Sequence, residues 1–523
     1  MKALRRYWWA AAFLAGLAAL AVFEAATGLL SGAKVLSTGL GLFALGLLLL
    51  AAASVAAVWL LRLLLRLEWA PLAVARTVVD EALRMRIAVA FVVLLLVLLA
   101  ALPPALDPAT PLRYRIQVCL SYGLGAAGFL LSLETIFLAC GTLSLEVQDQ
   151  RIFSVMSKPV GRGEYLLGKW LGIALLNAAF LGVAGLAIYG MARYLARLPA
   201  MNEHDRQAVD REILTARLAA RPRPAQPVAQ RVEQRLELLR RHAPEQLAEG
   251  EDKLRAQLRQ QILAQWRSIG PAQGETYVFD GLAHARRRGQ PVQLSFMVLT
   301  SKYVEGQTVN LGFLLNGRLH PVRAVTGLHQ VLPVAPQEIT EDGRLELTVL
   351  NTDPRDPGRS PQVSVAFPPG SGLEVLYEAG SFEANFARTV VIEWVKLGFL
   401  ASLGLAAASC LGFPVACLLA LAVFFAARVS GFVLGGLEYY GADFTSAGMK
   451  YFAAFVRAIV KALTWTLQHH SRFTPADEVA DGRLVSWAEL AACLGWVGLL
   501  WSGCTGLVGW LIFRARELGR VQV

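Results

Sequence analysis

Charged residues are scarce in this chain of 523 amino acids. Asp, Glu, Lys and Arg make up 17% of it, whereas a soluble globular domain carries about 25%. Hydrophobic residues make up 55%, and the mean hydropathy is +0.47. A chain with so few charges cannot keep its whole surface in water, so a soluble enzyme, a disordered chain and a collagen-like fibre are all excluded.

Cysteine is also rare, and it is placed where it does not build a disulfide framework. The six cysteines lie in or beside apolar runs, at Cys119, Cys140, Cys410, Cys417, Cys493 and Cys504. This excludes a small secreted protein held together by disulfides. It leaves the redox compartment open.

The motifs of common hydrolases and metalloenzymes are absent. Neither G-x-S-x-G nor H-E-x-x-H occurs, and no Cys/His metal framework is present. His469 and His470 are adjacent, so on a helix they would point about 100° apart and not form a metal pair. Segment 163–170 approaches the phosphate-binding pattern G-x-x-x-x-G-K-[ST], but Trp170 replaces the hydroxyl residue that holds Mg²⁺. We therefore expect no catalytic residue, no cofactor and no metal in this chain.

Long apolar runs are what the chain has in abundance. A membrane helix needs about 20 mostly apolar residues, and eight runs meet this requirement: 8–31, 38–61, 87–106, 118–143, 168–189, 390–410, 411–434 and 487–513. The first run is longer than the apolar core of a signal peptide and a second follows at once, so we expect it to remain as a span. The sequence predicts an α-helical polytopic membrane protein with about eight transmembrane helices.

Basic residues predict the orientation of these spans. Lys and Arg cluster before the first span, after the second, between the fourth and fifth, and after the last. With eight spans all four segments fall on one side, and an excess of Lys and Arg marks the cytoplasmic side. We expect a protein of the cell (inner) membrane with both termini cytoplasmic. The net charge of +11 then indicates loops beside anionic lipid and not nucleic-acid binding.

The insert between the fifth and sixth spans is then a large extracytoplasmic region. Its first part, 191–273, is highly charged and has apolar residues at helical spacing. Its second part, 274–388, contains β-rich runs punctuated by Gly, Pro, Asn and Asp, which is typical of an all-β sandwich. These runs are 292–300, 309–315, 330–334, 345–350, 363–367 and 373–377. Asn351, Asp353 and Asp356 between two runs are accounted for by turns, with a calcium site as the alternative.

The membrane part divides into three segments. Residues 1–66 form an N-terminal transmembrane hairpin, and 67–190 contain an amphipathic helix and the next three spans. The basic amphipathic stretch 63–86 predicts a helix in the cytoplasmic interface. Residues 389–523 hold the last three spans, with an outer amphipathic segment at 435–486.

Two glutamates lie within apolar spans. A carboxyl group in lipid is costly, so it faces protein, a partner or water. Glu134 lies well inside its span and is the intramembrane candidate, with a structural, hydrogen-bonded glutamate as the alternative. Glu24 lies near the outer end of its span and can reach the interface.

The most informative segment is the cytoplasmic loop 144–167. Ile152, Phe153 and Met156 lie within about one turn of a predicted helix, and their side chains form an apolar knob. Pro159 ends this helix. Three basic residues surround the knob: Arg151, Lys158 and Arg162. An exposed apolar stripe beside a membrane needs a partner to cover it.

This loop resembles the first cytoplasmic loop of ABC-2-type transporter permeases, whose pattern is roughly S-x-E-x-x-x-x-T-I-x-x-L-L-S-[KR]-P-[VI]-x-R-x-E-x-[IL]-x-G-K. The matching residues are Glu146, Ile152, Ser157, Lys158, Pro159, Arg162, Glu164, Gly168 and Lys169, and Arg151 replaces the usual Thr. Segment 76–84 is similar to the family's elbow helix, 473–487 to its outer segment before the last span, and 514–518 to its tail. The resemblance covers about 75–190 and 390–523.

The resemblance implies a permease subunit that depends on a separate ABC ATP-binding subunit, which would bind ATP and Mg²⁺. It also implies a second permease subunit and surrounding membrane lipid. The coupling residues would be Glu146, Arg151, Ile152, Phe153, Met156, Lys158, Pro159, Arg162 and Glu164. Spans with few charges favour export of an amphiphilic or envelope-related substrate.

A non-transporting receptor or anchor is the alternative hypothesis. In it, the outer β-domain would bind an envelope glycan or protein, and the spans would only hold that domain at the membrane. The sandwich pattern motivates this hypothesis by fold analogy alone.

Overall fold

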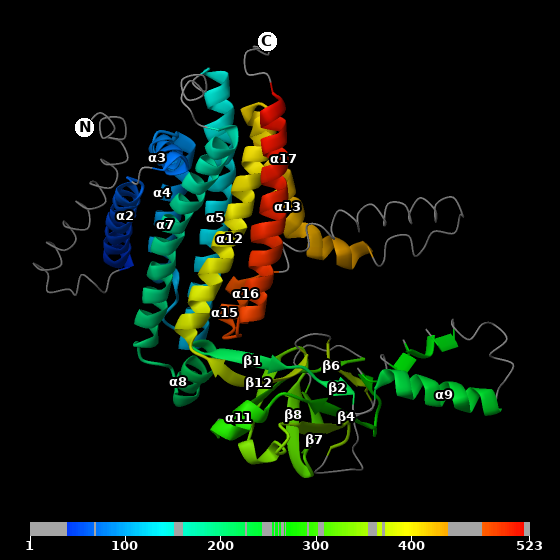
Figure 1. The fold of residues 1–523 in the computed structure, drawn as a ribbon. Helices are drawn as coiled ribbons and strands as arrows, with labels where there is room; N and C mark the ends of the chain where they lie inside the picture. The colour runs from blue at the N-terminus through cyan, green and yellow to red at the C-terminus, as the bar shows by residue number, and fades with distance from the viewer. Residues whose placement is uncertain are drawn as a thin grey trace, which may run out of the picture. The chain divides into compact units, whose positions relative to one another are not determined.

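The structure is a computed structural model whose described residues fall into two compact units. One unit comprises Met1–Thr215 with Ser381–Val523, and the other is Ala216–Gly380 (Figure 1). The described residues are 39–66, 69–150, 161–224, 227–242, 268–289, 292–301, 308–353, 363–368, 372–437 and 473–516, with scattered positions between 254 and 266. Each unit has its own hydrophobic core.

Seven helices among the described residues are long and apolar enough to cross a membrane. They are α2 (Gly39–Leu64), α4 (Arg86–Ala105), α5 (Leu112–Gln148), α7 (Arg162–Ala196), α12 (Phe382–Cys410), α13 (Phe413–Leu437) and a final span made of α16 (Trp487–Cys493), η7 (Leu494–Trp501) and α17 (Ser502–Ala515). Each covers one predicted span from 38–61 onward, and the predicted span 8–31 lies outside the described residues. These helices support the prediction of a helical membrane protein.

Two of these helices are much longer than the apolar runs 118–143 and 168–189 that predict them. α5 has 37 residues and α7 has 35, so they extend about 55 and 53 Å at 1.5 Å per residue. The hydrocarbon core of a bilayer is only about 30 Å thick. The predicted runs are therefore the apolar parts of longer helices, because an apolar run stops at the first polar residues while helical hydrogen bonding continues through them.

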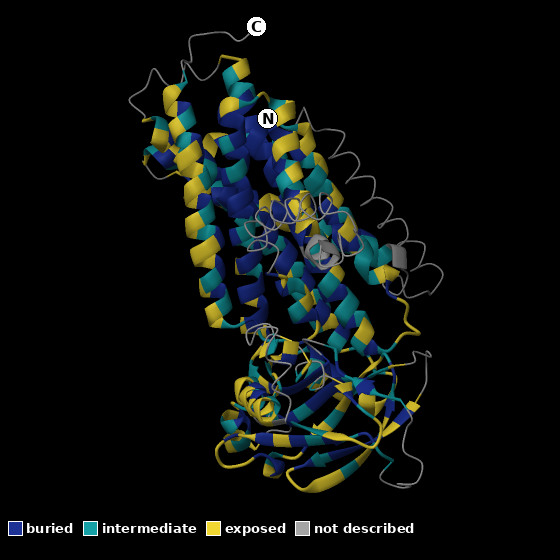
Figure 2. Cartoon of the chain, turned by 90° about the vertical axis from the view of Figure 1, so that its right-hand side faces the viewer, coloured by how far each residue is buried: buried dark blue, intermediate teal, exposed yellow. Residues whose placement is uncertain are grey.

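α5 and α12 are the most deeply buried spans, and Figure 2 shows buried residues concentrated along the middle of the helical unit. The close approach of α12 to α5 explains part of this burial. A Cβ atom on Gly404 of α12 would lie only 2.7 Å from the Cβ atom of Ala139 on α5. α2, α4, α13 and the final span are far more exposed and carry exposed large apolar side chains. Such surfaces fit helices that face lipid.

α3 (Ala70–Ala82) is a short amphipathic helix that packs on α7. Pro71 lies in its first turn, where a missing N–H group is tolerated. Gly168 and Gly172 of α7 are four residues apart on one helix face, and this small-xxx-small spacing lets two helices approach closely. The helix predicted within 63–86 is therefore present, and one of its faces is buried against α7.

The second unit contains three sheets whose strand pairs are antiparallel. The four-stranded sheet has the order β1 (Ala216–Ala220), β12 (Leu373–Gly380), β5 (Val292–Met297), β9 (His329–Val334). The five-stranded sheet has the order β2 (Arg223–Pro224), β4 (Gly274–Phe279), β10 (Leu345–Leu350), β7 (Thr308–Leu315), β8 (Arg318–Val325). The small sheet has the order β3 (Ser268–Ile269), β11 (Val365–Ala366), β6 (Leu299–Thr300). Phe296 of β5 and Phe313 of β7 meet edge to face with ring centroids 5.0 Å apart, so the two larger sheets share one core.

All six β-rich runs predicted from the sequence correspond to strands, at β5 with β6, β7, β9, β10, β11 and β12. β8 has no counterpart among those runs, because Pro321 and its charged neighbours break the alternation. It is an edge strand, where proline is tolerated. Asn316 and Gly317 both have positive φ and make the tight β7–β8 turn, which is the known use of an Asn-Gly pair.

The charged segment 191–273 is not helical throughout, which corrects the prediction for it. Besides α9 (Val228–His242), it contains β1 and β2, and the second compact unit begins at Ala216 and not at 274. β1 pairs along β12, so a partner distant in sequence decides its conformation. α8 (Glu203–Ala208) and η3 (Val209–Ile213) belong to the helical unit. Most of the outer segment 435–486 lies outside the described residues, and its described end contains the short helix α15 (Pro475–Ala480).

The α3–α7 contact yields a first prediction, for the substitution Gly168→Ala. A Cβ atom there would lie 2.6 Å from both the Pro71 carbonyl oxygen and the Val74 Cβ atom. Overpacking of this kind costs about 1–3 kcal/mol, so we expect a lower melting temperature for the purified protein in detergent. Gly182→Ala on the same helix is the matched control, since its Cβ atom would meet nothing within 4 Å. Equal melting temperatures for the two variants would contradict this packing.

Candidate functional site

A lysine is buried at one end of the helical unit, where three helices meet. The side chain of Lys169 on α7 has no exposed surface, and its Nζ atom lies 2.7 Å from Glu146 Oε1 on α5 and 3.2 Å from Glu81 Oε2 on α3. It also donates a 3.1 Å hydrogen bond to the Thr142 carbonyl oxygen. The three donors of the ammonium group thus have three acceptors, as a buried charge requires.

Tyr165, one turn earlier on α7, extends this group of contacts to the last helix. Its hydroxyl donates to the second carboxylate oxygen of Glu146. Its ring stacks on Phe513 of α17 with centroids 6.0 Å apart and an interplanar angle of 17°. Both oxygens of the Glu146 carboxylate are therefore engaged by side chains of α7.

Arg162 begins α7 and holds the end of α17. Its Nη1 atom donates to the carbonyl oxygens of Phe513 at 3.1 Å and Arg514 at 2.7 Å. These are carbonyl groups that the end of a helix leaves without internal partners. Glu164 accepts a hydrogen bond from the Gly161 N–H group at 3.1 Å and so caps the start of α7. The residues Glu81, Glu146, Arg162, Tyr165 and Lys169 are called the Lys169 joint below.

Residues of the joint flank the segment 151–160 in the sequence, with Glu146 before it and Arg162 after it. Of the predicted coupling residues, Glu146, Arg162 and Glu164 are described, and Glu146 and Arg162 belong to the joint. Arg162 is bonded to α17, so it does not lie free on the rim of the apolar knob. The remaining predicted residues, Arg151, Ile152, Phe153, Met156, Lys158 and Pro159, lie outside the described residues.

Three members of the joint are absent from the predicted site: Glu81, Tyr165 and Lys169, the last of which enters only as a match to the family's pattern. The available signal was Lys169 itself, since a cation near the start of an apolar span requires a carboxylate partner. The identity of that partner depends on the α3–α7 contact, which the sequence pattern does not contain.

Basic segments lie together at this end of the helical unit. Arg62 at the end of α2 pairs with Asp80 of α3 at 2.5 Å, and Arg514 and Arg516 end α17. Figure 1 shows α3, the end of α17 and the adjoining ends of α5 and α7 at the same end of the helical unit. These segments are the ones whose Lys and Arg content predicts the cytoplasmic side.

Acidic residues organise the opposite end. Asp205 of α8 accepts hydrogen bonds from the N–H groups of Leu112, Arg113 and Met201, at 2.8, 3.1 and 3.2 Å. Burial opposes ionisation, but these donors and the Arg113 charge outweigh it and lower the pKa of Asp205. The ionised side chain therefore caps the start of α5.

Glu478 of α15 titrates near neutrality. Burial raises the pKa of its carboxyl group to about 7, and the charges of Glu489 and Asp477 add to this effect against the opposing charge of Arg483. A carboxyl group at this position changes its charge within the physiological range.

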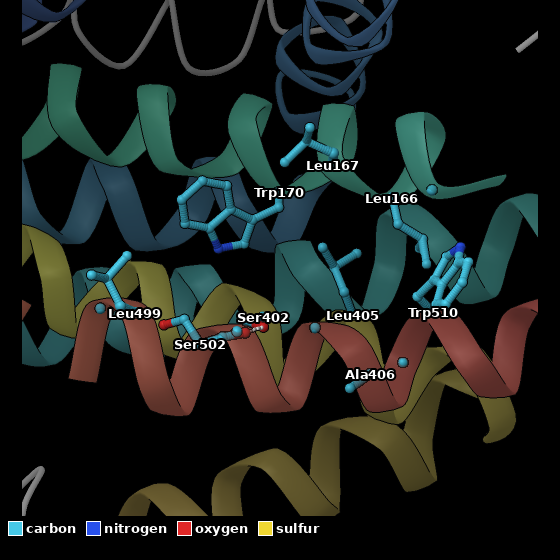
Figure 3. Close-up of a pocket in the computed structure, with 14 residues that line it drawn as sticks. Leu166, Leu167, Trp170, Ser402, Leu405, Ala406, Leu499, Ser502 and Trp510 are labelled. Carbon is cyan, nitrogen blue, oxygen red and sulfur yellow. Dashed lines mark hydrogen bonds between the residues drawn. The ribbon is translucent and has the colours of Figure 1, made fainter. Parts of the chain in front are cut away.

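Figure 3 shows a cavity of about 330 Å³ between α7, α12 and the final span. Trp170 borders it and donates a 2.8 Å hydrogen bond to the Gly398 carbonyl oxygen. Ser402 donates to the Ser502 carbonyl oxygen at 2.7 Å. The side chains of Trp170, Ser402 and Ser502 along this cavity are therefore hydrogen-bonded to the protein itself.

A second cavity of about 330 Å³ differs from the first in that a carboxyl group, that of Glu134 on α5, borders it. Glu134 is fully buried, and neither carboxylate oxygen has a hydrogen-bond partner among the described residues. The other intramembrane glutamate of the sequence, Glu24, lies outside the described residues.

The described residues contain no group of three or more His, Cys, Asp or Glu side chains that could hold a metal ion. Asn351 is buried, and its side-chain amide donates to the carbonyl oxygens of Ile269, Gly270 and Val363 at 2.9–3.2 Å. Asp353 accepts from the Asn310 side chain. Asn351 thus fastens a turn, whereas Asp356 lies outside the described residues.

Comparisons with known proteins found no matching family model, no matching curated protein and no matching solved structure.

The Lys169 joint yields a second prediction, for Lys169→Met. The substitution would remove the buried cation that the partly exposed Glu146 and Glu81 carboxylates contact, and removing one partner of a buried pair costs about 3–5 kcal/mol. We expect a large fall in melting temperature in detergent. Arg193→Met is the matched control, because it breaks the half-exposed pair of Arg193 with Glu383, and exposed pairs contribute about 0–1 kcal/mol. Similar losses in the two variants would contradict a structural role for the joint.

Glu478 yields a third prediction, for the pH dependence of stability. Between its ordinary pKa of 4.5 and about 7, the folded protein holds a proton that the unfolded chain has released. The free energy of unfolding should therefore fall as the pH rises through this interval and level off above about 7. Glu478→Gln should remove this component, which thermal unfolding at pH 5 and pH 8 would detect. Glu489→Gln, which removes one repelling charge, should only reduce it, and identical pH profiles for Glu478→Gln and wild type would refute the assignment.

Proposed function

We propose that this chain is the membrane subunit of an ABC-2-type transporter, acting as an exporter in the cell (inner) membrane. It would have eight spans, both termini in the cytoplasm and an outer domain of the β-sandwich type. The observation that carries the proposal is the Lys169 joint. It fastens the two helices that flank 151–160, the segment whose sequence resembles the family's coupling loop.

The joint would transmit a force on 151–160 to the membrane-spanning parts of α5 and α7. Separating α5 from α7 at this end would unpair Glu146 and Lys169, which lie 2.7 Å apart, in a buried site. The two helices therefore move together, and the same contacts bring α3 and α17 with them. Both helices are long enough to carry such a movement across a bilayer.

The chemical work would come from partners. A separate ABC ATP-binding subunit would bind ATP and Mg²⁺ and press on 151–160, and a second permease subunit would complete the transport path. The basic residues at the joint end support its placement on the cytoplasmic side. The few charges in the spans favour an amphiphilic or envelope-related substrate, and the outer domain would contact an envelope component.

Phe153→Asp gives the fourth prediction and tests this proposal. An unpaired carboxylate in the contact with the ATP-binding subunit should cost about 2–5 kcal/mol, so affinity should fall more than tenfold. The measurement is co-purification of ATPase activity with the chain, and its stimulation by the chain, from native membranes. Expression level and melting temperature in detergent serve as folding controls.

Phe153→Leu is the matched variant, since it keeps an apolar anchor at the same position. We expect it to retain most of the assembly that Phe153→Asp loses. Normal assembly of Phe153→Asp would refute docking through this segment. Failure of any ATPase to co-purify with wild type, together with glycan or protein binding by the outer domain, would favour the receptor or anchor hypothesis.

A further inference from the structure

The cavity beside Glu134 has the composition of a binding site for an amphiphile. It is lined mainly by apolar residues of α2, α4, α7 and the end of α3, and α5 contributes Glu134. Its volume of about 330 Å³ lies within the range of small-molecule sites. Val55 and Trp59 border it and are 70% and 66% exposed, whereas Glu134 is fully buried. The cavity thus leads from the surface of the helical unit to α5, one of its two most buried spans.

The carboxyl group of Glu134 has no partner that would make it a structural residue. Neither oxygen accepts or donates a hydrogen bond among the described residues. The neighbouring hydroxyl groups are engaged elsewhere, since Thr135 donates to the Leu131 carbonyl oxygen at 2.6 Å and Ser132 to that of Gly128 at 2.6 Å. A buried polar group without a partner destabilises a fold. Among the described residues nothing satisfies Glu134, whereas a molecule that enters the cavity would.

A second polar atom borders the same cavity. Arg62 pairs with Asp80 through Nη2, while its buried Nε–H group has no acceptor among the described residues. Because Asp80 balances the guanidinium charge, the cavity does not repel a cation. Within the part of the chain that the structure describes, the cavity therefore combines an apolar body with a carboxyl group and one N–H donor that have no hydrogen-bond partner.

We propose that this cavity binds an amphiphile whose apolar chain lies among Val58, Val92 and Phe180 and whose polar group donates hydrogen bonds to Glu134. A primary amine would pair with the ionised carboxylate, and a hydroxyl group would bond to either protonation state. The entrance beside Val55 and Trp59 suits a molecule that arrives from the lipid phase. This inference concerns binding alone, so it stands whether or not the chain is a permease.

Glu134→Leu tests the proposal and is the fifth prediction. We expect the variant to melt at a higher temperature than wild type when no ligand is added, because it removes an unpartnered buried polar group. A carboxyl group with a structural role would give the opposite result. Dodecylamine and dodecanol, added to the full-length protein in a neutral maltoside detergent, are the probes.

Wild type should be stabilised saturably by at least one probe, and Glu134→Leu should bind it at least tenfold more weakly. Glu134→Gln separates the two chemistries, since it should weaken only dodecylamine if the carboxylate is ionised and retain dodecanol. Ser402→Ala is the matched control, because Ser402 borders the other cavity of about 330 Å³, and it should leave binding unchanged. Equal probe binding by wild type and Glu134→Leu, or a lower melting temperature of unliganded Glu134→Leu, would overturn the proposal.

Discussion

The ammonium group of Lys169 lies out of contact with water, so the protein must surround it with acceptors. The acceptors are one carboxylate of α3 and one carboxylate and one carbonyl group of α5. These contacts hold α3 and α5 against α7. The close approach that this needs is possible because Gly168 and Gly172 leave room for α3 on α7. The Glu81–Lys169 ion pair and the two glycines thus both stabilise the packing of α3 on α7.

Two carboxyl groups of α5, the partly exposed one of Glu146 and the fully buried one of Glu134, differ in their hydrogen bonding. Glu146 has both oxygens engaged, by Lys169 and Tyr165, and it fastens helices. Glu134, three turns away on the same helix, has neither oxygen engaged within the described residues. Because an unsatisfied group weakens a fold, the second arrangement is explained by binding and not by stability.

The sequence predicts the seven described apolar helices because a bilayer demands long apolar runs, and those runs are visible without any knowledge of packing. It predicts Glu134 as a candidate for the same reason, since a carboxyl group stands out in such a run. It does not predict the cavity, whose walls come from α2, α4 and α7, nor the pairing of Lys169 with Glu81, which is 88 residues away. Likewise β1 takes its conformation from β12, and Pro321 is compatible with a strand only because β8 lies at an edge.

The Lys169 joint and the cavity beside Glu134 differ in the movements that their contacts allow. At the Lys169 joint, α3, α5 and α7 share ion pairs that cannot be broken without depriving the buried Lys169 charge of an acceptor, so that end is suited to moving as a rigid body. α2 and α4 are far more exposed than α5, and they border the cavity. Small displacements of these two helices would change the cavity without unpairing the joint. A ligand beside Glu134 could therefore enter or leave while the packing of α3, α5, α7 and α17 stays intact.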